Sequence, residues 1–221
     1  MSTTTPRVAS PSRVTSRTTG RLLAGAMLAA PLFVGVAATQ VLARDGFDLT
    51  RHPLSLLSTG PGGWVQIANF VLTGLLVIGF AVGLRRMRRS GRAGTWGPIL
   101  FGVLGVGLVA AGVFVADPGL GFPPGTPEVT EPTWHGTAHN IAALLATDPA
   151  TIGCVVLARR FSRDGERRWA VASVAMAVAV LLVGWWPDPG SISIRLAVVV
   201  TLLLGYVSLV AAKLRREMAP R

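Results

Sequence analysis

The chain has 221 residues, of which 51% are hydrophobic and 14% are charged, whereas soluble domains carry about 25% charged residues. The charges gather in short islands between apolar runs of about 20 residues, the length that crosses a bilayer, so composition excludes an ordinary soluble domain. The net charge of +11 does not indicate a nucleic-acid-binding protein, because the basic residues flank the apolar runs and no such motif accompanies them. The single cysteine, Cys154, cannot form a disulfide within the chain.

The N-terminal segment, residues 1–20, is half Ser and Thr, contains arginines and has no acidic residue. Such a segment cannot bury enough apolar surface to fold, so we predict a disordered tail. The apolar run that follows, residues 22–43, is longer than the core of about 7–15 residues that a signal peptide uses. We therefore predict that it is an uncleaved first span.

Five further apolar runs follow along the chain. Only helices satisfy their own backbone hydrogen bonds within lipid over such lengths. The sequence therefore predicts an all-α integral membrane bundle of six transmembrane helices, forming one domain over residues 21–216, with spans at residues 22–43, 64–84, 96–116, 136–158, 169–186 and 192–212.

The basic residues predict the orientation of this bundle. Residues 1–21, the second and fourth loops and the C-terminus together hold 18 of the 21 Lys and Arg residues, whereas the other side has only Arg44, Arg51 and Arg195. The positive-inside rule then places both termini in the cytoplasm of a multi-pass cell-membrane protein. The expected partners are the lipid bilayer and anionic lipid headgroups on the cytoplasmic side, and not nucleic acid. All six tryptophans fall at predicted span ends, where amphipathic rings concentrate.

The stretch TWHGTAHN, residues 133–140, places His135 and His139 four apart, on one face of a helix. With His52 as a third ligand, the histidines fit a metal site of a hydrolase. The pattern is weak, because Gly136 stands where the metalloprotease motif has glutamate. The alternative is a polar collar at the membrane surface, and a haem is disfavoured because all three histidines lie at one level. We expect no stoichiometric metal and no cofactor.

The predicted topology gathers polar residues on the extracytoplasmic side. Arg51, beside His52, is a candidate anchor for a phosphate or carboxylate. Arg195, near the start of the sixth span, can extend toward the surface or pair with an outer acid such as Asp188. The candidate outer-face polar cluster consists of Arg51, His52, Asp117, His135, His139, Asp188 and Arg195. No residue is identified as catalytic.

Asp148 is the one carboxylate that falls near the middle of a predicted span. A charge at this depth is costly and suggests a proton or ion path. The sequence Thr147-Asp148-Pro149 also fits a helix that breaks and restarts, with Asp148 capping its second half. The sequence leaves both interpretations open and favours the helix break.

Three segments resemble a known family: RHPLSLLSTGPGGWVQIANFVLTGLLVIGFAVGLRR, WGPILFGVLGVGLVAAGVFVADPGLGFPPG and WHGTAHNIAALL. The chain is similar over residues 51–145, and more weakly onward, to an actinobacterial membrane family known as domain of unknown function nine-nine-eight. The resemblance implies six helices and no established activity. The positions that look characteristic of it are His52, Pro53, Ser55, Trp64, Asn69, Asp117, Pro118, Gly121, Phe122, Pro123, Gly125, His135, His139 and Arg195. The segment LLATDPAT departs from it, because a mid-helix Asp-Pro is not expected there.

Three hypotheses for function follow from these features. The first is a non-enzymatic membrane protein with an extracytoplasmic polar recognition surface, and we favour it. The second is a metal-dependent membrane hydrolase that uses His52, His135 and His139. The third is a small proton-coupled transporter with Asp148 at its centre. The sequence leaves open whether the protein is an enzyme.

Overall fold

The computed structural model describes residues 13–87 and 93–218, and every regular element within them is helical. In chain order the elements are α1 (Arg13–Ala26), α2 (Ala29–Ala43), η1 (Leu54–Ser58), α3 (Gly63–Arg86), α4 (Ala93–Val113), α5 (Trp134–Arg163), α6 (Arg167–Gly184), η2 (Pro189–Ser191) and α7 (Ile192–Glu217). Six of the described segments are long and apolar enough to span a membrane, which confirms the predicted all-α bundle: Arg17–Ala43, Gly63–Arg86, Gly94–Val113, Trp134–Arg163, Arg167–Gly184 and Pro189–Glu217.

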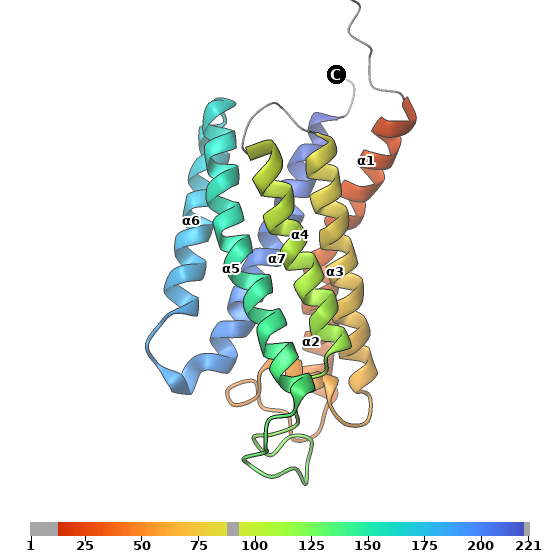
Figure 1. Ribbon diagram of the computed structural model, residues 1–221, viewed down its shortest axis with the longest axis vertical. Helices are drawn as coiled ribbons and strands as arrows, with labels where there is room; N and C mark the ends of the chain where they lie inside the picture. Colours follow the sequence, from red (N-terminus) through yellow and green to blue (C-terminus); the bar gives the residue numbers. More distant parts are fainter. Residues whose placement is uncertain (1–12, 88–92, 219–221) are drawn as a thin grey trace, which may run out of the picture.

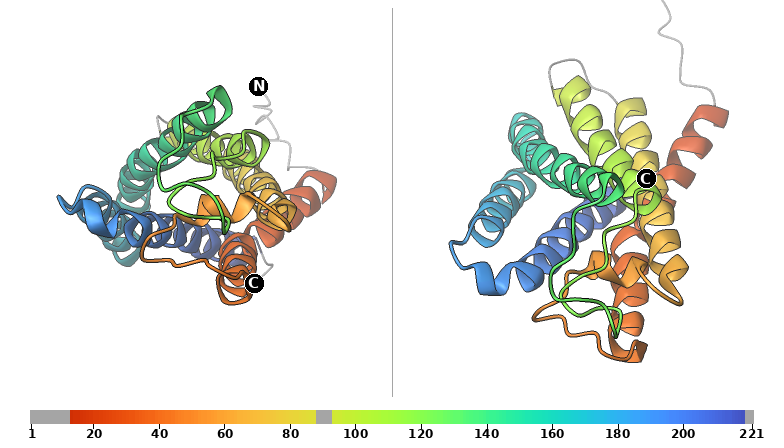
Figure 2. Two further views of the ribbon diagram at one scale, coloured as in Figure 1. Left: turned by 90° about the horizontal axis from the view of Figure 1, so that it is seen from below. Right: turned by 60° about the horizontal axis from the view of Figure 1, so that its bottom comes forward.

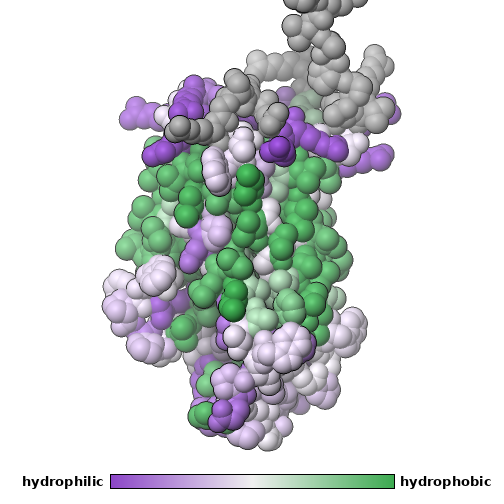
Figure 3. Space-filling model, in the orientation of Figure 1, coloured by the Kyte–Doolittle hydropathy of each residue, from purple (hydrophilic) through white to green (hydrophobic). Residues whose placement is uncertain are grey.

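The helices run side by side along one axis, so the connections collect at two ends of the bundle (Figures 1 and 2). One end holds the start of α1, the end of α7 and the turn between α5 and α6. We call it the arginine-rich end, after Arg85, Arg86, Arg159, Arg160, Arg163, Arg167, Arg168, Lys213, Arg215 and Arg216. The opposite, loop end holds residues 44–62, 114–133 and 185–191. Hydrophobic side chains form a broad band between the two ends (Figure 3).

The first span consists of two helices with a break at Met27 and Leu28. Pro31 lies in the first turn of α2, where a missing N–H is tolerated, so the new helix begins just before it. The prediction of a disordered tail is wrong for residues 13–20, which belong to α1. Thr19 is buried against the bundle, because the helix that starts at Arg13 continues directly into the apolar segment after residue 21. The rest of the predicted tail, residues 1–12, lies outside the described residues.

Glycines allow the central helices to approach closely. A Cβ at Gly74 of α3 would lie 2.6 Å from the carbonyl oxygen of Gly105 on α4, and a Cβ at Gly105 would lie 2.8 Å from that of Gly74. Gly107, also on α4, faces the backbone of α5 in the same way, 2.8 Å from the carbonyl oxygen of Ala142. Small residues at such crossings bring backbones together and increase van der Waals contact between membrane helices. Helices α3, α4 and α5 therefore form the tightly packed part of the bundle.

Helix α7 closes the bundle on the other side and contacts α1, α2 and α6. Its buried face includes Leu203, Leu204 and Val207. The Tyr206 hydroxyl and Ser173 Oγ on α6 share a buried hydrogen bond of 2.7 Å. Helix α6, by contrast, exposes most of its apolar side chains, because its main contacts within the described chain are with α5 and α7.

Candidate functional site

Two loops at the loop end, residues 44–62 and 114–133, lie close to each other (Figure 2). His52 of the first loop joins it to the second. Its Nδ1 accepts a hydrogen bond of 2.9 Å from the backbone N–H of Asp48, so the proton must be on Nε2, which donates to the carbonyl oxygen of Leu120 at 3.0 Å. The ring is 3% exposed and packs between Phe47 and Phe122, with ring centroids 5.3 and 5.4 Å away. Both ring nitrogens of His52 are therefore used within the fold.

Two arginines strengthen this connection. Arg44 donates to the carbonyl oxygens of Leu57 and Thr59, at 3.0 and 2.7 Å, and its guanidinium lies over the Phe122 ring. Arg51 donates to both carboxylate oxygens of Glu128 at 2.9 Å, although both side chains are more than half exposed. We call this group the loop clasp, consisting of Arg44, Arg51, His52, Leu120, Phe122 and Glu128. Because the loop clasp holds the two loops together, the loop end presents a structured surface.

Asp48 and Ser193 hold the first loop in place. The Asp48 carboxylate accepts hydrogen bonds from the N–H and hydroxyl of Thr50, at 2.8 and 2.7 Å. These bonds favour the charged form and lower the pKa of Asp48 below its ordinary value, with a smaller contribution from the charge of Arg51. Ser193 of α7 donates to the carbonyl oxygen of Arg51 at 2.8 Å, so the start of α7 holds the loop on its membrane side.

The motif TWHGTAHN forms the joint between the second loop and α5. Thr133 is the N-cap, and its hydroxyl oxygen accepts a hydrogen bond of 3.1 Å from the N–H of Gly136. The Asp117 carboxylate accepts from the N–H and hydroxyl of Thr133 and thus lies at the N-terminus of α5, where a negative charge is stabilised. Asp117 has a structural role at this joint, because it fixes where the helix begins.

His135 and His139 occupy different environments, although one turn of α5 separates them. His139 is 4% exposed, and its Nδ1 donates to the carbonyl oxygens of Ala111 and Phe114, at 3.0 and 2.8 Å, at the end of α4. His135 is exposed and stacks beside Trp134 and Phe114. His139 therefore caps α4, and His135 lies at the surface.

Arg195 and Asp188 belong to the turn between α6 and α7. Arg195 donates to the carbonyl oxygens of Gly184, Trp186 and Asp188, so it caps the end of α6. The Asp188 carboxylate does not pair with Arg195 but accepts from the N–H of Gly190 at 3.1 Å. Arg195 Nε is buried and has no hydrogen-bond partner in the described part of the chain.

The candidate outer-face residues thus form three separate sets at the loop end: Arg51 with His52, Asp117 with His135 and His139, and Asp188 with Arg195. Among the described residues, no cluster of three or more His, Cys, Asp or Glu side chains is arranged to hold a metal ion.

Asp148 lies in the middle of α5, and the predicted helix break there is wrong, because α5 continues without interruption from Trp134 to Arg163. The hydroxyls of Thr147 and Thr151 donate to carbonyl oxygens one turn earlier, at 3.2 and 3.0 Å, so both side chains find their partners within the helix on either side of Pro149. Ala146 and Ala150 are buried, whereas Asp148 is exposed, because two residues correspond to a rotation of roughly 200°. A polar patch interrupts the hydrophobic band over α5 at this height (Figure 3). Asp148 therefore faces outward.

A cavity of about 100 Å³ lies beneath the loop clasp, that is, on its membrane side, within the bundle. Its lining comes from α2, α3, α4, α5, α7 and residues 53–55, and is apolar except for Ser55, His139 and Thr147. Because the lining residues Ala143 and Leu196 are exposed, the cavity opens toward the membrane between α5 and α7. Since Nδ1 of His139 donates to α4, its Nε2 is an acceptor in the neutral ring, and it has no partner among the described residues.

A second buried polar group lies between α2 and α3 and was not predicted as a site. Gln40 donates to the side-chain oxygen of Gln66 at 2.8 Å, and Asn69 donates to the same oxygen at 3.2 Å and to the carbonyl oxygen of Phe33 at 3.1 Å. Gln40 Oε1 and Gln66 Nε2 are buried and find no partner among residues 13–87 and 93–218, an acceptor and a donor that suit one buried water. The signal available in the sequence is the spacing of Gln66, Asn69 and Thr73, which places all three on one face of α3.

Comparison with known proteins identifies one family. A family model described as a protein of unknown function, DUF998, matches residues 27–218. No curated protein and no solved structure matches the chain.

Proposed function

Because the chain belongs to the DUF998 family, a family of unknown function, we propose its role from its own geometry: it is a non-enzymatic multi-pass protein of the cell membrane that binds an amphipathic molecule at its loop end. The arginine-rich end then faces the cytoplasm with both termini, and the loop end faces outward. The distribution of Lys and Arg supports this orientation. We retain the actinobacterial origin as an expectation from the resemblance.

The cavity beneath the loop clasp carries this proposal. It is mainly apolar and opens toward lipid between α5 and α7, and His139 lines it with an Nε2 that no described residue uses. Its volume of about 100 Å³ is comparable to the dry cavities of about 150 Å³ that accept benzene. We expect part of an alkyl or prenyl chain to enter it, with a hydroxyl group donating to His139. We expect the polar remainder of the molecule to meet Arg51, which precedes the lining residue Pro53 by two positions in the same loop.

The experiment is photo-crosslinking in membranes with a long-chain alcohol that carries a diazirine. We expect labelled peptides from α5 and α7, reduced by an excess of unlabelled alcohol. Ala143→Trp closes the opening and should abolish this labelling. The matched control is Leu144→Trp, since Leu144 is 61% exposed and does not line the cavity. Equal labelling of both variants would contradict the proposal.

No observation on the described residues supports the metal-dependent hydrolase or the proton-coupled transporter. A hydrolase metal site would have to recruit His52, whose ring nitrogens are both engaged, and His139, whose Nδ1 is engaged. Elemental analysis of protein purified without chelators tests it directly. About one zinc per chain, lost on His135→Ala or His139→Ala, would favour the hydrolase. A proton-coupled transporter would depend on Asp148, which faces away from the cavity side of α5.

A further inference from the structure

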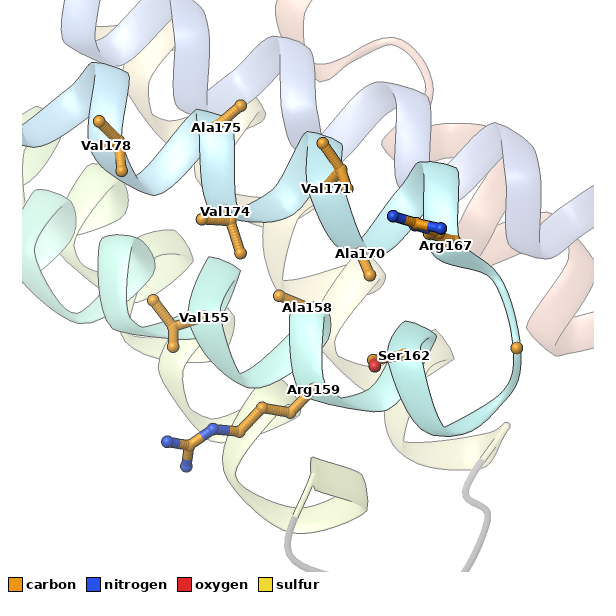
Figure 4. A pocket seen from close by; sticks show the side chains of 11 residues that line it. Val155, Ala158, Arg159, Ser162, Arg167, Ala170, Val171, Val174, Ala175 and Val178 are labelled. Atoms are coloured by element: carbon orange, nitrogen blue, oxygen red, sulfur yellow. The ribbon is translucent and has the colours of Figure 1, made fainter.

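A groove of about 840 Å³ runs between α5 and α6 at the arginine-rich end (Figure 4). Its walls are apolar and come from both helices, including Val155 and Ala158 of α5 and Val171, Val174 and Val178 of α6. Val171 is 60% exposed and Val174 is 49% exposed, so the groove opens outward from the bundle. Since α5 and α6 span the membrane, the groove faces lipid.

The end of this groove at the helix turn is polar and positively charged. Arg159 on α5 and Arg167 on α6 both line this end, with Ser162 between their positions, and the Arg159 side chain is directed away from α6 (Figure 4). Both arginines are exposed, and neither has an ion pair or hydrogen bond with any described residue.

The acidic residues of the same turn leave this positive charge uncompensated. Asp164 pairs with Arg160 at 3.8 Å, and Glu166 pairs with Lys213 of α7 at 2.5 Å. Lys213 also lies over the rings of Phe161 and Trp169, which holds this second pair on the α7 side. The two groove arginines are therefore available to a negatively charged ligand.

We propose that this groove binds an anionic phospholipid of the leaflet at the arginine-rich end. One acyl chain lies along the valines of α5 and α6, where it replaces looser contacts with bulk lipid. The phosphate lies near Ser162, within reach of Arg159 and Arg167. Guanidinium groups form bidentate, charge-assisted hydrogen bonds with phosphate, and the long arginine side chains can turn toward it.

A second copy of the chain fits this groove less well. A two-fold symmetric contact places the same patch of both copies together. It would bring Arg159 and Arg167 of one copy against those of the other, without described carboxylates to separate them. An anionic lipid complements the charge that a second copy would repel. The site is also independent of the cavity near His139, which lies at the opposite end of the bundle.

The test is native mass spectrometry of the full chain, titrated with phosphatidylglycerol and with phosphatidylcholine of the same chain length. We expect phosphatidylglycerol to be retained preferentially. The double variant Arg159→Gln/Arg167→Gln should weaken this binding at least tenfold, or about 1.4 kcal/mol. The control Arg85→Gln/Arg86→Gln removes the same charge at the same end, outside the groove, and should bind nearly as the wild type does.

Val174→Trp fills the groove without changing its charge and should weaken binding as well, whereas Leu182→Trp on the lipid-facing side of the same helix should not. Unfolding temperatures measured in phosphatidylcholine show whether each variant is folded. Equal losses in the groove pair and the control pair would overturn the proposal, because they would indicate charge attraction without a site. Efficient crosslinking of Val174→Cys between two chains in membranes would also overturn it in favour of a second copy.

Discussion

The Asp117 carboxylate occupies the space that a side chain at position 136 would fill. A Cβ built on Gly136 would lie 1.9 Å from Oδ2 of Asp117. The same carboxylate accepts from the N–H of Thr133, so it cannot move away without losing its bond at the start of α5. The glycine in TWHGTAHN is therefore required by the acid at the end of the preceding span.

We predict that Gly136→Ala destabilises the protein by roughly 1–3 kcal/mol, because the added methyl group forces Asp117 or α5 to shift. Thermal unfolding in detergent, followed by tryptophan fluorescence, measures the loss. In an Asp117→Ala background the same substitution should cost much less, since the clash is removed. Additive effects of the two substitutions would show that they do not interact.

The two histidines of the same motif should respond differently to substitution. His139→Leu removes the donor to the carbonyl oxygens of Ala111 and Phe114 and should cost about 1–3 kcal/mol of stability. His135→Leu should change stability by less than about 0.5 kcal/mol, because His135 is at the surface.

His139→Asn separates capping from ligand binding. The asparagine amide can donate near the position of Nδ1, so we expect much of the stability to return, while the acceptor Nε2 is lost from the cavity. Photo-labelling by the diazirine alcohol should therefore stay weak in this variant. Full labelling of His139→Asn would show that Nε2 does not bind the hydroxyl group.

The six spans could be predicted from the sequence, because hydropathy and helix length depend only on local composition. The break between α1 and α2 is also a local feature, since Pro31 marks it, but the prediction treated the span as one helix. The helix break at Asp148 was predicted from a local capping pattern and is wrong. Tertiary contacts of α5 with α4 and α6 outweigh the single hydrogen bond that Pro149 cannot make.

For the candidate site, only the end of the bundle at which its residues lie could be predicted from the sequence. The sequence places His52, His135 and His139 at one end of the bundle, and the structure agrees. The partners of these side chains are backbone carbonyl oxygens of Leu120, Ala111 and Phe114, whose positions depend on how loops and helix ends fold. Every residue has a backbone carbonyl oxygen, so the sequence does not indicate which of them will accept these hydrogen bonds. The capping roles of the histidines therefore could not be predicted.

We predict that Asp148→Leu is folded and more stable than the wild type, because a charged aspartate at the centre of a span costs about 2.5–3.5 kcal/mol on insertion scales. Membrane yield and thermal unfolding measure the change. Asp148→Asn should also fold. If Asp148→Asn instead abolished proton-linked uptake into vesicles at normal expression, Asp148 would be functional and the transporter hypothesis would be favoured.

The stability of the first loop should depend on pH through Asp48. Since its hydrogen bonds with Thr50 lower the pKa of Asp48, the stabilisation is present above the ordinary aspartate pKa of about 4 and is lost as pH falls through the lower, folded-state value. The difference in unfolding temperature between the wild type and Asp48→Ala should therefore shrink in acid below pH 4. A difference that stays constant down to pH 2 would contradict this.

The orientation of the bundle can be tested with cysteines, because the native Cys154 is fully buried and gives little background labelling. Val129 is 83% exposed in the loop after α4, and Arg216 is exposed at the end of α7. In intact cells, a membrane-impermeant maleimide should label Val129→Cys, whereas Arg216→Cys should react only after lysis. The reverse pattern would place the arginine-rich end outside, against the positive-inside rule. It would also move the proposed phospholipid site to the outer leaflet and the cavity of His139 to the inner one.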